Sequence, residues 1–131
     1  MKRSRVLLVD DNRSFLAVLQ EFLSEHEGIE VIGAASSGEE ALALLERLNP
    51  DLMIIDLAMP GMSGLELLQA IRARGSHVTT IVLTLLDTPR HRQAASEAGA
   101  SAFVAKAYMD ADLLPTIHQL LTKSGNASQP A

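Results

Sequence analysis

The chain has 131 residues, of which 47% are hydrophobic and 21% charged, and a net charge of −5. This length fits one domain, and this balance of residues is that of a globular protein and excludes a disordered one. The acidic charge and an aromatic content of 3% argue against direct nucleic-acid binding, while the absence of cysteine excludes disulfides and thiolate catalysis and fits a cytoplasmic location.

Short apolar runs alternate with longer segments of helical periodicity. In chain order, the sequence predicts a strand at Val6–Val9, a helix over 15–23, a strand at Val31–Ile32, a helix over 41–48, a strand at Leu52–Ile55, a helix over 65–71, a strand at Ile81–Leu83, a weaker helix over 94–98, a strand at Ala102–Val104 and a helix over 113–121. This alternation predicts a parallel sheet with right-handed crossovers, a doubly wound three-layer α/β domain.

The two ends of the chain have different compositions. The basic segment Met1–Arg5 precedes only the short apolar run Val6–Val9, which is too short for a signal peptide or a membrane span. Residues 123–131 are polar and lack apolar periodicity, so we expect a disordered tail or linker there. The predicted domain therefore covers residues 1–122.

Polar residues follow four of the predicted strands directly. Asp10 and Asp11 follow the first strand, Asp56 the third, Thr84 the fourth and Lys106 the fifth. Each residue alone has an ordinary explanation, as a helix cap or a surface charge. Ligands of open parallel sheets bind beyond the carboxyl ends of the strands, so the group as a whole predicts a functional site.

The chemistry of this group points to phosphoryl transfer. Three carboxylates in one place repel each other unless a cation joins them, and Mg²⁺ suits a site of few carboxylates completed by water. An aspartate can act as a nucleophile toward a phosphoryl group. A lysine and a hydroxyl can then hold the phosphoryl oxygens that the metal leaves free. The four histidines are scattered over other segments, and we expect them at the surface without a role in the site.

Four segments carry a resemblance to a known family. They are VLLVDDN at 6–12, DLAMPGMSGLELL at 56–68, TLLD at 84–87 and AFVAK at 102–106. Together they resemble the receiver domain of bacterial two-component response regulators, a CheY-like domain, over roughly the whole predicted domain. The resemblance implies a flavodoxin-like (βα)5 fold with the parallel sheet order 2-1-3-4-5.

The resemblance also implies roles for the residues at the predicted site. Asp56 matches the aspartate that accepts a phosphoryl group from the phosphohistidine of a histidine kinase or phosphotransfer protein. Asp11 matches a direct Mg²⁺ ligand, Asp10 a water-mediated one, and the backbone carbonyl of Ala58 a third protein ligand beside Asp56. Lys106 matches the lysine that binds the phosphoryl group. The chain would thus be a signalling domain that catalyses only its own phosphorylation and dephosphorylation, without being an enzyme for a metabolite.

Two further positions match the switch of such domains. Thr84 matches the switch hydroxyl, which also takes part in phosphoryl transfer, and Phe103 matches the switch aromatic. Repacking of these side chains would change the face formed by the fourth helix, the fifth strand and the fifth helix. We expect this face to bind a partner or a second copy of the chain.

Three positions depart from the commonest family pattern. Ala107 follows Lys106 where a proline in a cis peptide is usual, Leu85 follows Thr84 where Ala or Gly is common, and Ala58 stands where many relatives carry a longer or polar side chain. A cis bond before a residue other than proline costs about 3 kcal/mol, so we expect a trans bond at Ala107. The departures at Ala107 and Leu85 resemble receivers attached to LuxR-type DNA-binding domains, which would make transcription the output through a domain absent from this chain.

Two other functions remain as alternatives. Mg²⁺-dependent phosphatases with an aspartate nucleophile also place an aspartate after a strand, but they carry a second aspartate two residues later, where this chain has Ala58. A flavin-binding module on the same fold would need a phosphate loop after the first strand, where Asp10 and Asp11 repel phosphate.

Overall fold

The computed structural model describes residues 3–128, and the side chains of residues 3–122. These residues form a five-stranded parallel sheet in the order β2-β1-β3-β4-β5, which confirms the predicted fold and sheet order. The elements are β1 (Ser4–Val9), α1 (Arg13–Ser24), β2 (Ile29–Ala35), α2 (Gly38–Leu48), β3 (Leu52–Ile55), α3 (Gly64–Ala73), β4 (Thr79–Thr84), α4 (Pro89–Ala98), β5 (Ala102–Ala105), the 3₁₀ turn η1 (Lys106–Tyr108) and α5 (Met109–Ser128).

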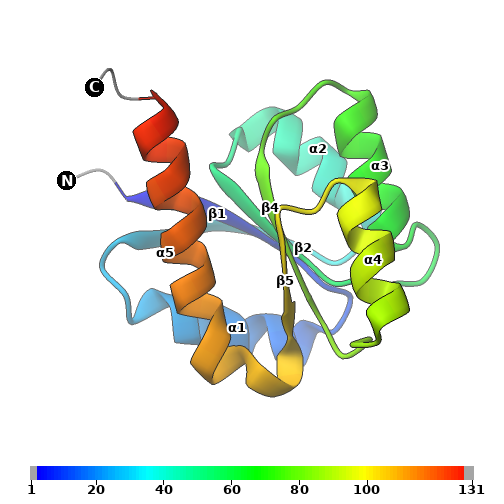
Figure 1. Cartoon of the computed structure of the whole chain (residues 1–131), viewed down its shortest axis with the longest axis horizontal. Coiled ribbons are helices and arrows are strands. Elements are labelled where there is room, and N and C mark those ends of the chain that lie inside the picture. The colour runs from blue at the N-terminus through cyan, green and yellow to red at the C-terminus, as the bar shows by residue number, and fades with distance from the viewer. Residues whose placement is uncertain (1–2, 129–131) are drawn as a thin grey trace.

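Helices cover both faces of the sheet. Figure 1 shows α1 and α5 on one face and α2, α3 and α4 on the other. Successive residues of a strand point to opposite faces, so β3 divides its side chains between two cores. Leu52 and Ile54 pack with α1 and α5, whereas Met53 and Ile55 pack with the other three helices. All four are buried, which explains why this strand is continuously apolar.

Polar side chains mark the start of four helices. Asn12, Ser37, Ser63 and Thr88 begin α1, α2, α3 and α4, and each accepts a hydrogen bond from the backbone N–H three residues later. At α3 the bond is reciprocal, because Glu66 also accepts a hydrogen bond from the backbone of Ser63. These caps set the lengths of the loops that follow β1, β3 and β4, and those loops surround the carboxyl edge of the sheet.

The last helix, α5, continues past residue 122 to Ser128. The predicted boundary between domain and linker therefore falls within a helix, while residues 129–131 of the predicted tail lie outside the described residues. The division of the chain at residue 122 stays a prediction. Within residues 3–128, no helix is both long and apolar enough to cross a membrane.

Candidate functional site

The carboxyl edge of the sheet gathers the polar residues that the sequence singled out. Asp10 follows β1 and Asp56 follows β3, and these two strands are neighbours in the sheet. Thr84 ends β4, and Lys106 follows β5 beside it. Asp10, Asp56 and Thr84 are at most 6% exposed. A domain of this size buries carboxylates only where they are paired, so this edge is the candidate site.

Asp10, Asp11 and Asp56 form a compact acidic cluster. One carboxylate oxygen of each residue lies within 4.8 Å of the other two. Asp10 and Asp56 are buried, whereas Asp11 is exposed, so the cluster is open to solvent on one side. Oxygen donors at this spacing with an open side fit Mg²⁺, which usually keeps several of its waters.

Lys106 brings one positive charge to this cluster. Its Nζ donates hydrogen bonds to Asp10 Oδ2 at 2.8 Å and to Asp56 Oδ2 at 3.3 Å, and its side chain is 10% exposed. One ammonium against three carboxylates leaves a local excess of negative charge, which a divalent cation would neutralise. The peptide bond between Lys106 and Ala107 is trans, as predicted.

The pKa of Asp10 is raised in this cluster of charges. Burial is the largest cause that raises its pKa above the usual value for an aspartate, and the nearby charge of Asp56 raises it further. The hydrogen bond from Lys106 and the backbone N–H of Asn12 act in the opposite direction but do not cancel the rise. The ionised cluster is therefore costly by itself, and a bound cation would favour the charged form of Asp10.

The loop after β3 fixes the position of Asp56. Its Oδ1 accepts a hydrogen bond from the backbone N–H of Ala58 at 3.2 Å. The first residue of α3, Gly64, packs directly against this loop and donates its N–H to Leu57 O at 3.0 Å. A Cβ at position 64 would collide with the carbonyl oxygen of Asp56 and lie 2.6 Å from the Cα of Leu57. The predicted role of the Ala58 carbonyl as a metal ligand stays a prediction.

Thr84 lies at the same edge with its hydroxyl tied to the following loop. The residue is 0% exposed, and its Oγ1 accepts a hydrogen bond from the backbone N–H of Leu86 at 3.3 Å. Thr84 comes two residues after Val82, which packs into the core beneath α2, α3 and α4, so both side chains are on this face of the sheet. A shift of the hydroxyl toward Asp56 would thus release the N–H of Leu86.

Phe103 is the diagonal neighbour of Thr84 on this face. In the sheet Phe103 pairs with Val82, and its half-buried ring packs against the core beneath α4. The guanidinium carbon of Arg92, on α4, lies 4.6 Å from the centroid of this ring. Arg92 also pairs with Asp87 in the loop after β4, with an N···O distance of 2.7 Å. The aromatic ring is therefore connected to both α4 and the loop that follows Thr84.

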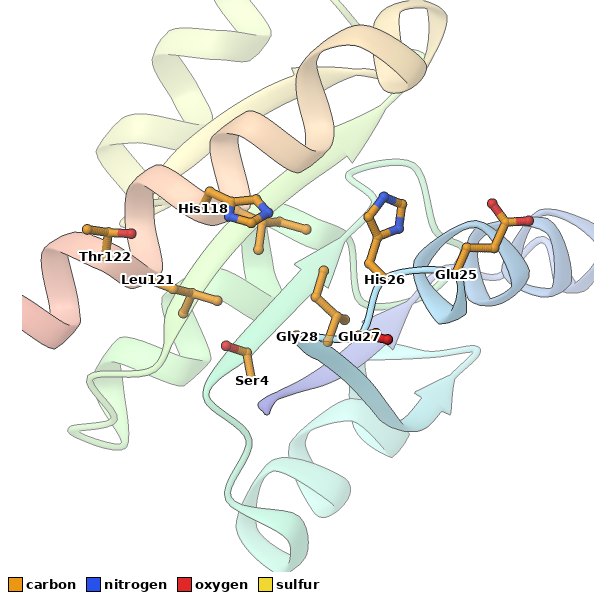
Figure 2. A pocket seen from close by; sticks show the side chains of 10 residues that line it. Ser4, Glu25, His26, Glu27, Gly28, His118, Leu121 and Thr122 are labelled. Atoms are coloured by element: carbon orange, nitrogen blue, oxygen red, sulfur yellow. The ribbon is translucent and has the colours of Figure 1, made fainter. Parts of the chain in front are cut away.

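None of the four histidines belongs to the acidic cluster. His91 lies in the first turn of α4, where its Nδ1 is 2.7 Å from Thr88 Oγ1. His26 and His118 line a cavity of about 530 Å³ at the opposite end of the sheet, together with Ser4 at the start of β1. Figure 2 shows His118, from α5, across the cavity from the loop that carries Glu25 and His26. Within residues 3–122, the group of three acidic or histidine side chains spaced to hold a metal is the aspartate cluster, which contains no histidine.

Two residues near the site were not given a role from the sequence. Phe15 contacts Lys106, and Arg92 covers Phe103. An aromatic residue four positions after the acidic pair and an arginine on a surface helix are common features with many explanations. Only the packing of distant elements distinguishes these two from other residues of their type. The sequence favours a role for Gly64 in the turn before the third helix, and the structure shows that the close approach of the Asp56 loop is what requires a glycine there.

A protein-family model and two curated proteins match most of this chain. Residues 6–118 match the family model of the response regulator receiver domain. The chain is 34% identical over 114 residues to the nitrate/nitrite response regulator protein NarL of Escherichia coli (strain K12), covering 87% of this chain and 53% of that protein. It is 42% identical over 107 residues to a protein-glutamate methylesterase/protein-glutamine glutaminase of Geobacillus kaustophilus, covering 81% of this chain and 31% of that protein.

A solved structure with the same arrangement is a two-component response regulator of the LuxR family from Aurantimonas sp. SI85-9A1. It superposes with a TM-score of 0.88 at 28% identity, covering 93% of this chain and 87% of the other. The chain thus spans about half the length of NarL and less than a third of the methylesterase. The similarity to these two relatives therefore covers only part of their length.

Proposed function

The chain belongs to the response regulator receiver domain family, whose members signal by phosphorylation, and from this we propose that Asp56 is the residue that accepts the phosphoryl group. The donor would be the phosphohistidine of a sensor histidine kinase or a phosphotransfer protein. The observation that carries this proposal is the convergence of Asp10, Asp11 and Lys106 on Asp56 at the carboxyl edge of the sheet.

The chemistry requires no general base, since a carboxylate is already deprotonated at neutral pH. A carboxylate oxygen of Asp56 forms the new P–O bond while the P–N bond to the donor imidazole breaks, and the imidazole nitrogen leaves with the electron pair. The ammonium of Lys106 lies 3.3 Å from Asp56 Oδ2 and would pair with a phosphoryl oxygen. The hydroxyl of Thr84 would hold another phosphoryl oxygen.

Four residues would hold the Mg²⁺ that receiver domains typically use. They are Asp10, Asp11, Asp56 and, through its backbone carbonyl, Ala58. The bound ion would neutralise charge on the phosphoryl oxygens. Asp11 is the exposed member of the acidic cluster and would contact the ion from the solvent side, while the buried Asp10 would hold both the ion's water shell and Lys106.

The test of this function is metal-dependent phosphorylation of the purified chain. Phosphoramidate with Mg²⁺ should add one phosphoryl group, measured as an increase in intact mass. Excess chelator should slow the labelling by about a hundredfold or more, because the negative charges that meet in transfer would then lack their counterion. Labelling at the same rate in chelator would contradict the proposed role of the acidic cluster.

The signal would leave the site through Thr84 and Phe103. A phosphoryl group on Asp56 offers oxygens that the Thr84 hydroxyl can reach only by moving inward and leaving the N–H of Leu86. This movement opens space that the ring of Phe103 can enter, which would break its contact with Arg92 on α4. A local charge would thus become a repacked surface over α4, β5 and α5, by a shift in population between two arrangements.

Replacement of Thr84 by Ala should uncouple this surface from the site. Beryllofluoride, a stand-in for a phosphoryl group on Asp56, should shift NMR signals along α4 and β5 in the parent chain. In Thr84→Ala the shifts should stay near Asp56, because no hydroxyl moves. Thr80→Ala is a matched control, since Thr80 is another buried threonine of β4 but bonds to Ser101 instead. Parent shifts confined to the pocket would rule out this route.

The output of the whole protein is also a proposal, since the chain spans 53% of NarL. Similarity to regulators of the LuxR family supports control of transcription through a DNA-binding domain elsewhere, and we propose the α4–β5–α5 face as the partner or dimer surface.

We propose a cytoplasmic signalling module that turns over no metabolite. A phosphatase is not favoured, because Ala58 lacks the carboxylate of a general acid, and a flavin module is not favoured, because Asp10 and Asp11 occupy the phosphate loop.

A further inference from the structure

An aromatic ring from α1 faces the ammonium group at the centre of the site. The Nζ of Lys106 lies 4.0 Å from the centroid of the Phe15 ring, within the distance of a cation–π interaction. Phe15 is half-buried and packs against the core beneath α1 and α5. The ring is therefore held by its own packing and offers one face to Lys106.

Phe15 also belongs to a closed chain of contacts around the site. Asp10 Oδ1 accepts the backbone N–H of Asn12 at 2.9 Å, and Asn12 Oδ1 accepts the backbone N–H of Phe15 at 3.0 Å. Lys106 contacts the ring of Phe15 and donates to Asp10 Oδ2 at 2.8 Å, which closes the circle. The helix cap that begins α1 thus sets the position of the ring relative to the carboxylate that binds Lys106.

The face of the Phe15 ring partly replaces the water that burial removes from the ammonium of Lys106. The side chain of Lys106 is 10% exposed, so most of the water that would hydrate its charge is excluded. An ammonium has three N–H donors, and Asp10 and Asp56 are its two carboxylate acceptors. The face of an aromatic ring attracts the charge without being a strong hydrogen-bond acceptor, so it leaves a donor available for a phosphoryl oxygen.

We propose that Phe15 is a positioning residue that holds the ammonium of Lys106 where it can bind a phosphoryl group on Asp56. Without this ring the ammonium of Lys106 would sample positions away from the site, because it is carried on a flexible four-carbon side chain. The inference rests on the proposed function of Asp56 and Lys106, and it adds a residue on α1 to the group that determines how well they work.

The experiment compares Phe15→Leu with Phe22→Leu. Both phenylalanines are on α1, are half-buried and pack against the same core, but the ring of Phe22 lies beside His26. Phe15→Leu should weaken the binding of beryllofluoride and slow phosphorylation by phosphoramidate, each about five- to tenfold, as expected for loss of a cation–π contact at a partly desolvated site. Phe22→Leu should stay within about twofold of the parent in both measurements.

Three further measurements separate positioning from a general effect on stability. Phe15→Tyr keeps an aromatic face and should retain parental affinity, while Phe15→Leu made in a Lys106→Met background should cause no further loss. In the unmodified chain, NMR should show the Cε protons of Lys106 shifted upfield by the ring current of Phe15.

Each outcome decides the inference. An unshifted Lys106 signal in the parent chain, or equal losses in Phe15→Leu with and without Lys106, would overturn the positioning role even if the leucine variant folds poorly. A parent chain that is not labelled at Asp56 would instead contradict the proposed function. Labelling of the parent together with parental rates in Phe15→Leu would leave the function intact and remove Phe15 from it.

Discussion

Replacement of Asp56 by Asn is expected to reduce phosphorylation to less than about one hundredth of the parent level. An amide has nearly the same shape as the carboxylate and can accept the hydrogen bond from Ala58, but it lacks the charge and the nucleophilic oxygen. The measurement is intact mass after incubation with phosphoramidate and Mg²⁺. The fold should survive, because neutralising one of three neighbouring carboxylates removes repulsion.

Asp51→Asn is the matched control for this variant. Asp51 directly precedes β3, at the end of the strand opposite Asp56. It accepts a hydrogen bond from the backbone N–H of Arg5 at 2.8 Å, so it is an aspartate with a structural partner outside the site. Its replacement should leave the extent of labelling unchanged. Equal labelling of Asp56→Asn and the parent would show that another residue accepts the phosphoryl group, and Asp11, the exposed acid of the cluster, would be examined next.

Replacement of Gly64 by Ala is expected to destabilise the domain by about 2–3 kcal/mol and to lower its melting temperature by about 10 °C. The added Cβ would meet the carbonyl oxygen of Asp56 and the Cα of Leu57. Both obstacles belong to the backbone, so no side chain can turn away to relieve the collision. The loop or the start of α3 must move instead, and phosphorylation of Asp56 should slow as well.

Gly28→Ala tests the same change where space is free. Nothing lies within 4 Å of the position of a Cβ at Gly28, and its backbone does not adopt a positive φ. Its stability should therefore change by less than about 0.5 kcal/mol. Thermal unfolding followed by circular dichroism compares the two variants. A melting temperature of Gly64→Ala equal to that of Gly28→Ala would mean that the loop carrying Asp56 yields without cost.

Local patterns along the chain were sufficient to predict the elements and most of the site. Leu52–Ile55 has the same bounds as β3, because a strand covered on both faces must be apolar at every position. Asp10, Asp56 and Lys106 could be placed at one edge because parallel strands all end on the same side of a sheet. The sheet order came from the family resemblance, since alternation of strands and helices is compatible with several orders.

Tertiary packing decided how these residues meet. Asp10 and Lys106 are 96 residues apart, and they follow strands that are not neighbours in the sheet. Their 2.8 Å contact exists because the long side chain of Lys106 reaches from the end of β5 past β4 to the carboxylates after β3 and β1. The contact of Phe15 with Lys106 and the lack of room beside Gly64 depend on how α1 and α3 pack against the carboxyl edge. Periodicity records which face of an element is apolar, but it holds no information about which atoms of two distant elements touch, and the geometry of this site is made of such contacts.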